Sequence, residues 1–176
     1  MIKKRYLFVF ALALFSCNQR KESEANTDLI YFDIKGYFAK EIIHLQELKP
    51  VVKKSVSING ALENKSLVIK DWTKELSVFV DADINKTSWK GSFVAIKNNH
   101  QETYTSSSKK IPVKKILIEK NGNKIRKVEI FIANKNILYT SNDTLTYYPD
   151  SLYQIEKRQK IRLLSAKKYS IIGKLR

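Results

Sequence analysis

The amino-acid sequence predicts an α+β fold, with a long N-terminal helix and a second, short helix packed on a curved, mainly antiparallel meander sheet. Two observations predict it. Apolar residues recur every three or four positions between residues 28 and 49, which is the spacing of one helical face. From residue 51 onward most segments alternate apolar and polar residues, and short Asn- and Gly-containing breaks between them are typical of antiparallel hairpins.

The long helix is expected over residues 28–49. Polar residues at positions 26–28 can cap its start, and Pro50 ends it. Gly36 lies inside this helix, where glycine is about 1 kcal/mol less favourable than alanine. Either close packing against another element or sequence drift explains this glycine. The predicted apolar face consists of Tyr31, Ile34, Phe38, Ile42, Leu45 and Leu48.

A hairpin and a short helix are expected to follow Pro50. Residues 51–58 and 61–69 are predicted strands, joined by Asn59-Gly60, a dipeptide favoured in type I′ turns. Asp71 is placed to cap the short helix. The apolar face of that helix is formed by Trp72, Leu76, Phe79 and Val80.

The rest of the chain is predicted to form a meander of about eight strands. A sheet of this size is expected to twist and to curl or close, with the long helix covering its concave apolar face. Polar breaks such as Asn142-Asp143 separate the strands. The expected strands are residues 89–97, 101–107, 113–120, 125–133, 137–141, 144–148, 152–164 and 169–175.

The start of the chain predicts export. A basic stretch, residues 1–5, precedes an apolar stretch of about ten residues, which is too short to span a bilayer, since roughly 20 are needed. The tetrapeptide Leu14-Phe15-Ser16-Cys17 resembles a bacterial lipobox, and this resemblance implies cleavage before Cys17 and attachment of lipid to it. An ordinary secretory signal cleaved near Ser16 is the alternative. Cys17 is the only cysteine, which excludes a disulfide framework.

The lipobox resemblance also implies an organisation and a location. We expect a signal peptide over residues 1–16, a lipidated flexible tether over residues 17–27 and a single α+β globular domain over residues 28–176. The lipid anchor would hold this domain at a membrane of the cell envelope. Asn18 follows the cysteine in place of the Asp that favours inner-membrane retention, so the outer membrane is expected rather than the inner one.

Positive charge is concentrated in the C-terminal strands. The formal net charge of the chain is +16; residues 109–176 contain 17 basic and 5 acidic residues, a net of +12, whereas residues 17–108 contain 13 and 12, a net of +1. Within residues 152–164, the even positions include Arg158, Lys160 and Arg162 and the odd positions include Tyr153, Ile155, Ile161 and Leu163, so one strand face is predicted to be basic. The candidate binding residues are Lys127, Arg158, Lys160, Arg162, Lys167 and Lys168.

Three interpretations of this basic face compete. It is the solvated face of a lysine-rich chain, or it binds anionic lipid headgroups, acidic glycans or an envelope protein, or it binds nucleic acid. Export argues against nucleic acid. So does the shortage of arginine, which suits bidentate phosphate contacts, because 27 of the 33 basic residues are lysine.

Residue patterns that would indicate catalysis or metal binding are missing from the sequence. Residues 81–85 open like an EF-hand loop, but Lys86 and Ser92 stand where that loop needs Gly and Glu. His44 and His100 are the only histidines, and no close spacing gives either of them the three or four ligands of a zinc site. No G-x-S-x-G, H-E-x-x-H, Walker A or G-x-G-x-x-G pattern occurs. We therefore expect no enzyme activity, no catalytic or metal-binding residues and no cofactor.

The whole chain resembles small uncharacterised lipoproteins of Bacteroidetes-type bacteria. Beside the lipobox, the resemblance rests on Asp71-Trp72-Thr73-Lys74-Glu75-Leu76, Asp83-Ile84-Asn85 and Tyr169-Ser170-Ile171-Ile172-Gly173-Lys174. It implies no known activity. A curved sheet with a helical cover also resembles periplasmic lipoprotein carriers, which is an analogy of fold alone.

Two functions are therefore considered. The first is a non-catalytic, membrane-anchored envelope lipoprotein that binds anionic lipid, glycan or a protein partner through its basic C-terminal strand face. The second is a carrier of a lipid or another apolar ligand between the curved sheet and the helix. A carrier needs an apolar cavity of roughly 300 Å³ or more, whereas an interior filled by Trp72, Phe79, Trp89 and Phe93 would favour the first function.

Overall fold

We analysed a computed structural model of the chain, which describes residues 29–176. The predicted signal peptide, Cys17 and the whole of the predicted tether fall outside the described residues, so cleavage and lipidation stay predictions. The described helices are α1 (Ile34–Leu48), α2 (Trp72–Glu75) and α3 (Ser77–Val80), followed by a 3-10 turn, η1 (Thr87–Trp89). No helix among residues 29–176 is long and apolar enough to cross a membrane.

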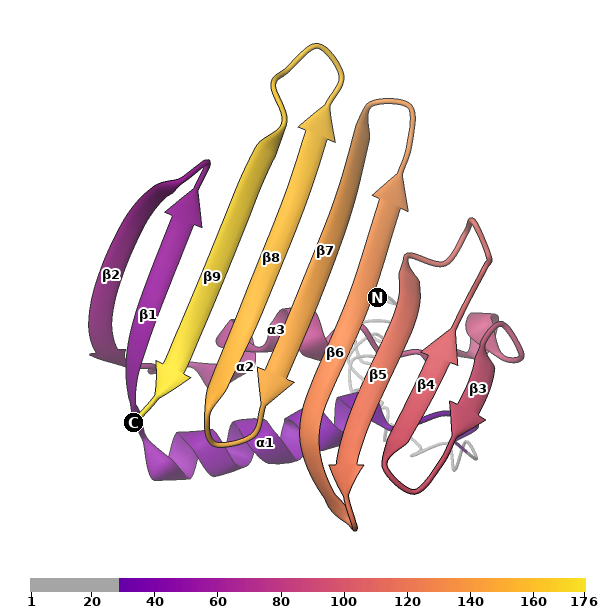
Figure 1. Ribbon diagram of the computed structural model, residues 1–176, viewed down its shortest axis with the longest axis horizontal. Coiled ribbons are helices and arrows are strands. Elements are labelled where there is room, and N and C mark those ends of the chain that lie inside the picture. The colour runs from indigo at the N-terminus through magenta and orange to yellow at the C-terminus, as the bar shows by residue number, and fades with distance from the viewer. Residues whose placement is uncertain (1–28) are drawn as a thin grey trace, which may run out of the picture.

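A single nine-stranded sheet forms most of the fold, and all of its strand pairs are antiparallel (Figure 1). The strands lie in the order β2-β1-β9-β8-β7-β6-β5-β4-β3, so β2 and β3 are its two edges. Their bounds are β1 Val51–Ile58, β2 Ala61–Val68, β3 Val94–Lys97, β4 Gln101–Thr105, β5 Val113–Asn121, β6 Lys124–Lys135, β7 Tyr139–Tyr148, β8 Leu152–Ile161 and β9 Lys167–Leu175. The α+β prediction with a mainly antiparallel sheet is confirmed.

The order of the strands results from one long connection between β2 and β3, the two edge strands. The β1–β2 hairpin turns at Asn59 and Gly60, which both have positive φ angles, as a type I′ turn requires. From β2 the chain runs through α2, α3 and η1 behind the sheet to the opposite edge, where β3 begins (Figure 1). Strands β3 to β9 then return as a meander, and β9 completes the sheet by pairing with β1. All helices of the described chain therefore lie on one face of the sheet.

The predicted long helix from residue 28 is not shown by the structure. Helix α1 begins at Ile34, because the Asp33 side chain caps it by accepting a hydrogen bond from the Gly36 N–H at 2.8 Å. A Cβ atom on Gly36 would overlap the Asp33 carboxylate, so this close approach explains the glycine. The helix ends at Leu48, ahead of Lys49 in the left-handed conformation.

Several predicted boundaries differ in the structure, and within β7 the reason is that pairing with neighbouring strands overrides local residue preference. Asn142 and Asp143, predicted to be a break, lie inside β7 and pair with β6 on one side and β8 on the other. The predicted strand 89–97 is reduced to β3, because η1 occupies its start. The predicted second helix is divided into α2 and α3, with Asp71 as its cap, as expected.

The core lies between the helices and the sheet. Phe38 on α1 packs against Phe79 and Tyr147, with ring centroids 4.9 and 5.2 Å apart. Ile34, Phe38, Ile42 and Leu45 are buried, as predicted, but Leu48 is exposed. Trp72, Phe79 and Phe93 are buried and Trp89 is partly buried, so aromatic side chains fill this layer.

The helices cover only part of that sheet face. In Figure 1 they cross behind the lower part of the sheet, while the far ends of β7, β8 and β9 extend above them. Burial along β8 follows this arrangement: Tyr153 is fully buried, Ile155 is partly buried and Ile161 is exposed. The sheet therefore has a helix-covered half and a distal end, and the distal end carries the loops β6–β7 and β8–β9.

Candidate functional site

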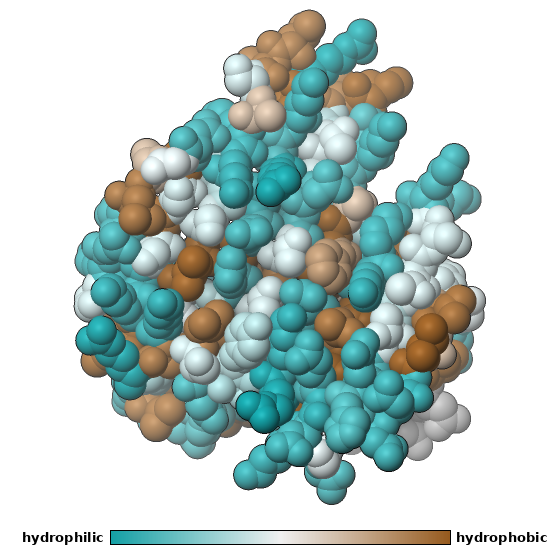
Figure 2. Space-filling view, in the orientation of Figure 1, coloured by the Kyte–Doolittle hydropathy of each residue, from teal (hydrophilic) through white to brown (hydrophobic). Residues whose placement is uncertain are grey.

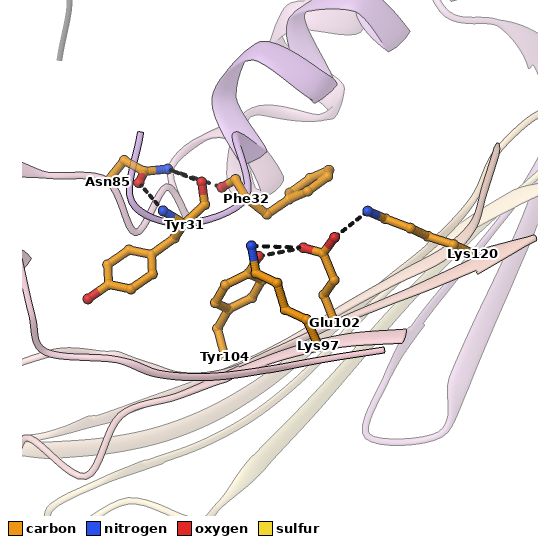
Figure 3. A network of polar contacts seen from close by, with 7 residues as sticks. All are labelled: Tyr31, Phe32, Asn85, Lys97, Glu102, Tyr104 and Lys120. Atoms are coloured by element: carbon orange, nitrogen blue, oxygen red, sulfur yellow. Dashed lines mark hydrogen bonds and ion pairs between the residues drawn. The ribbon is translucent and has the colours of Figure 1, made fainter. Parts of the chain in front are cut away.

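A polar network ties β3, β4 and β5 together beside the segment that precedes α1 (Figure 3). Glu102 accepts hydrogen bonds from the Tyr104 hydroxyl and the Lys120 ammonium group, and the Lys97 ammonium lies 3.9 Å from the same carboxylate. Burial alone would raise the pKa of Glu102, but these hydrogen bonds and the two lysine charges outweigh it and hold the pKa below its ordinary value. Every donor in the network is directed at Glu102, which indicates a structural role.

Asn85 fastens the segment before α1 to the rest of the domain (Figure 3). Its side-chain oxygen accepts from the Tyr31 N–H at 3.0 Å, and its amide group donates to the Phe32 carbonyl at 3.1 Å. Asp83 accepts from the Asn85 N–H at 2.9 Å, which closes a local turn. In residues 29–176 no group of three or more His, Cys, Asp or Glu side chains is arranged to hold a metal ion.

Two further carboxylates are held by buried tyrosines. Glu75 accepts from the Tyr153 hydroxyl and from Lys54, both at 2.6 Å, and Glu41 accepts from the Tyr147 hydroxyl at 2.7 Å. Burial, and next the neighbouring glutamates, raise the pKa of Tyr147 and of Tyr153, so both hydroxyls stay protonated and donate. These pairs join α1 and α2 to the sheet.

The two histidines, His44 and His100, both lie at the surface. His44 Nε2 lies 2.9 Å from Asp150 Oδ1, and both side chains are largely exposed. His100 is exposed in the β3–β4 turn, where its backbone N–H donates to the Asn98 side chain. His44 and Asp150 together supply two possible ligands, whereas a zinc site needs three or four.

A groove lies between the β1–β2 edge and the short helices. Its volume is about 640 Å³. Apolar side chains from the strands and α3, including Leu67, Val78, Ile155 and Ile171, line it together with four lysines and two carboxylates. These polar residues are Lys54, Lys65, Lys70, Lys74, Asp71 and Glu75. The groove is open to solvent, and none of the residues that line it is aromatic.

The structure brings most of the predicted binding residues together at the distal end. Arg158 on β8 stands directly opposite Lys168 on β9, and Lys160 follows two residues on, on the same face of the sheet. Arg162 lies in the loop after β8. Lys167 pairs with Gln159, so its side chain belongs to the opposite face. We call Arg158, Lys160, Arg162, Lys167 and Lys168 the basic cluster; all five are exposed.

Lys127 does not belong to this cluster. It lies near the other end of β6, where its ammonium group is 3.2 Å from Glu129 and 3.7 Å from Glu119. Burial would lower the pKa of Lys127, but the hydrogen bond and charge of Glu129, with further negative neighbours, raise it overall. Its charge is neutralised within the sheet. Alternation along the sequence places Glu129 on the same strand face as Lys127, but it could not reveal Glu119, which comes from cross-strand register with β5.

Sequence patterns did not reveal the apolar residues exposed at the distal end. Ile137 is 83% exposed, Leu138 64%, Leu163 97% and Leu164 57%. They occupy the β6–β7 loop (residues 136–138) and the β8–β9 loop (residues 162–166), which we call the distal tip. In Figure 2 apolar side chains stand at the top of the molecule among hydrophilic ones. All four residues lie inside strands predicted from the sequence, so nothing in the pattern indicated their exposure.

A backbone hydrogen bond joins the two loops of the distal tip. The Arg162 N–H donates to the Leu138 carbonyl oxygen at 2.7 Å. The tip therefore presents two apolar loops as one unit, directly next to the basic cluster.

Comparisons with known proteins found no relative of this chain. No protein family, curated protein or solved structure is significantly similar to this chain.

Proposed function

We propose that this protein is a non-catalytic lipoprotein, anchored to a membrane of the cell envelope through Cys17, that binds an anionic surface with its basic cluster. One observation carries the proposal: Arg158 and Lys168 face each other across β8 and β9, and three more basic side chains stand within the same strand ends and loop. Like charges directly opposite each other destabilise a sheet. An external anionic partner would remove that cost.

The charges of the basic cluster are available to a partner. Within residues 29–176 no carboxylate lies within ion-pair distance of any of its five side chains, whereas Lys120 and Lys54 each have one and Lys127 has two. Basic residues near an anionic surface contribute about 1 kcal/mol each within a Debye length. Five of them would contribute about 5 kcal/mol, a factor of several thousand in the binding constant.

The test uses the chain from Asn18 to Arg176, which retains every described residue and lacks only the predicted signal peptide and Cys17. We expect it to sediment with vesicles that contain phosphatidylglycerol and not with pure phosphatidylcholine vesicles. Binding should weaken as salt rises, because exposed charges are screened over about 8 Å at physiological ionic strength. The triple variant Arg158→Glu, Lys160→Glu, Arg162→Glu should lose most of the binding.

A matched control separates local charge from net charge. Lys35, Lys40 and Lys90 are exposed and lie outside the basic cluster. Their reversal to Glu changes the net charge by the same amount and should leave most of the binding intact. Equal losses in the two triple variants, or equal binding to neutral and anionic vesicles, would leave the solvated-surface interpretation as the better account.

The groove of about 640 Å³ supports a second candidate function, a carrier of an apolar ligand. Its volume exceeds the roughly 300 Å³ that a small-molecule site needs, although it is open to solvent, and its apolar lining is flanked by four lysines and by Asp71 and Glu75. Such a lining suits a fatty acid. A fluorescent fatty acid should then bind the chain with one-to-one stoichiometry, and Ile155→Glu should abolish that binding; no saturable binding would argue against this function.

A further inference from the structure

We propose that the distal tip inserts Ile137, Leu138, Leu163 and Leu164 into the interfacial layer of a bilayer that contains anionic lipid. The inference rests on the proposed function and names its partner, a lipid surface rather than a soluble acidic glycan. The basic cluster alone would suit either one. The apolar side chains distinguish them, because only a bilayer offers an apolar phase next to a layer of phosphates.

The distal tip is held in an outward conformation by its own hydrogen bonds. The Asn136 side chain accepts from the backbone N–H groups of Leu138 at 2.9 Å and Tyr139 at 2.8 Å, which shapes the β6–β7 loop. In the β8–β9 loop the Leu164 N–H donates to the Ile161 carbonyl at 3.0 Å. Leu163 has a φ angle of 68°, a left-handed conformation that is uncommon for a residue other than glycine. The exposed leucines are thus presented by ordered turns.

The exposure of these residues has no packing explanation. Single exposed apolar residues are normal on protein surfaces. Here, however, four large ones gather on two loops that share the hydrogen bond from Arg162 to Leu138, and Leu163 is 97% exposed. A side chain with that exposure makes almost no contribution to the core, so its apolar character serves no purpose inside the domain.

The basic cluster stands where lipid phosphates would be once the tip is inserted. Arg162 lies within the tip, Lys160 and Arg158 follow along β8, and Lys167 and Lys168 begin β9. Long basic side chains can keep their stems along an apolar surface while their charged ends reach the headgroup layer. An apolar end followed by basic side chains matches the order of layers in an anionic bilayer, read from the acyl chains outward to the phosphates.

The position of the tip gives it free access to such a surface. The helices lie behind the lower part of the sheet, and the two loops stand at the upper end of the longest strands (Figure 1). The described chain begins near β3 and β4, where Tyr31 packs on Phe93 and Tyr104. The start of the domain and the distal tip therefore lie at different ends of the molecule.

A single-cysteine probe tests the insertion. The chain from Asn18 to Arg176 has no cysteine, so Leu163→Cys labelled with an environment-sensitive fluorophore reports on the tip alone. With vesicles containing phosphatidylglycerol we expect a blue shift and quenching by lipids brominated on the acyl chain. Ile96→Cys, on the edge strand β3 and 66% exposed, is the matched control and should show neither change.

A second measurement uses the loss of apolar area. Leu163→Ser with Leu164→Ser should weaken binding to anionic vesicles by roughly tenfold or more, even at high salt, since each leucine transferred from water is worth about that factor at full burial. Val94→Ser with Ile96→Ser removes comparable exposed area and should change nothing.

The outcomes separate this inference from the proposed function. Salt-sensitive binding without a blue shift at position 163, or without loss in the double serine variant, overturns the insertion and leaves the basic cluster as an electrostatic site. Binding to acidic polysaccharide that is tighter than binding to anionic vesicles overturns the choice of lipid. No binding to either partner overturns both the insertion and the proposed function.

Discussion

The two ends of strand β8 lie in very different environments. Tyr153, near its start, is fully buried, donates to Glu75 and lies against Trp72. Ile161, at its end, is exposed beside the distal tip. The helix-covered half thus uses its side chains for the fold, whereas the distal end leaves large apolar and basic side chains facing water. Stability and binding should therefore respond to different sets of substitutions.

The largest effect on stability is expected at Phe38, in the centre of the helix-covered half. Replacement of a buried Phe by Ala costs about 3–5 kcal/mol, because contacts are lost and a cavity remains. Phe38→Ala should remove contacts with Phe79 and Tyr147 and lower the unfolding midpoint in a denaturant titration. Little change would mean that this face of α1 is not part of the stabilising core.

The next largest effect should come from Gly173. It stands opposite Tyr153 on the neighbouring strand, and a Cβ atom there would overlap the Tyr153 ring. Gly173→Ala should therefore destabilise the domain by about 1–3 kcal/mol, the usual range for overpacking. Ser170→Ala on the same strand is the control and should be nearly silent by thermal unfolding. Equal midpoints for the two variants would show that the ring moves aside freely.

A smaller, pH-dependent effect is expected at Glu102. Since its pKa is lower in the folded chain than its ordinary value, the folded state binds fewer protons, and stability rises with pH. The contribution is complete above the ordinary pKa of about 4.3 and is lost as pH falls through the folded value. Glu102→Gln should cost about 1 kcal/mol at pH 7. Its unfolding free energy should vary less below pH 5 than that of the unchanged chain, and an identical pH profile would contradict this.

The smallest effect on stability belongs to the distal tip. Leu163→Ser with Leu164→Ser should change the unfolding free energy by less than about 0.5 kcal/mol, as is usual for exposed positions. The same variant is the one expected to lose vesicle binding. A clear fall in the thermal unfolding midpoint would show that the tip supports the fold and would blur the contrast between the two regions.

Periodicity predicted the parts of this fold that local sequence determines. The apolar face from Ile34 to Leu45 and the Asn59-Gly60 turn were found as expected, since each depends on residues close together in the chain. The start of α1 was not, because Asp33 and not an earlier polar residue accepts the capping bond. Asn142 and Asp143 resemble a turn and yet continue β7, where neighbours on both sides complete their pairing.

The candidate site also has features that the sequence predicted and features that it could not predict. Alternation along residues 152–164 correctly separated Arg158 and Lys160 from the face that carries Tyr153. It could not show that Lys127 has a carboxylate partner, Glu119, on β5, since that contact depends on register. Nor could it show that Arg162 reaches Leu138 on another hairpin. Both facts belong to the tertiary structure.

Within residues 29–176 the sheet has two edge strands, β2 and β3, that pair with a neighbour on one side only, and their composition limits pairing with another chain. An unpaired strand edge can recruit another chain and seed aggregation. On β2 the charged side chains of Glu63 and Lys65 are exposed, which opposes the approach of a second sheet. On β3 only four residues offer backbone groups, too few for an extended pairing. Because Val94 and Ile96 are exposed, β3 is less protected against pairing with another chain than β2 is. Fibril formation in a destabilised variant such as Phe38→Ala should therefore begin at the β3 edge.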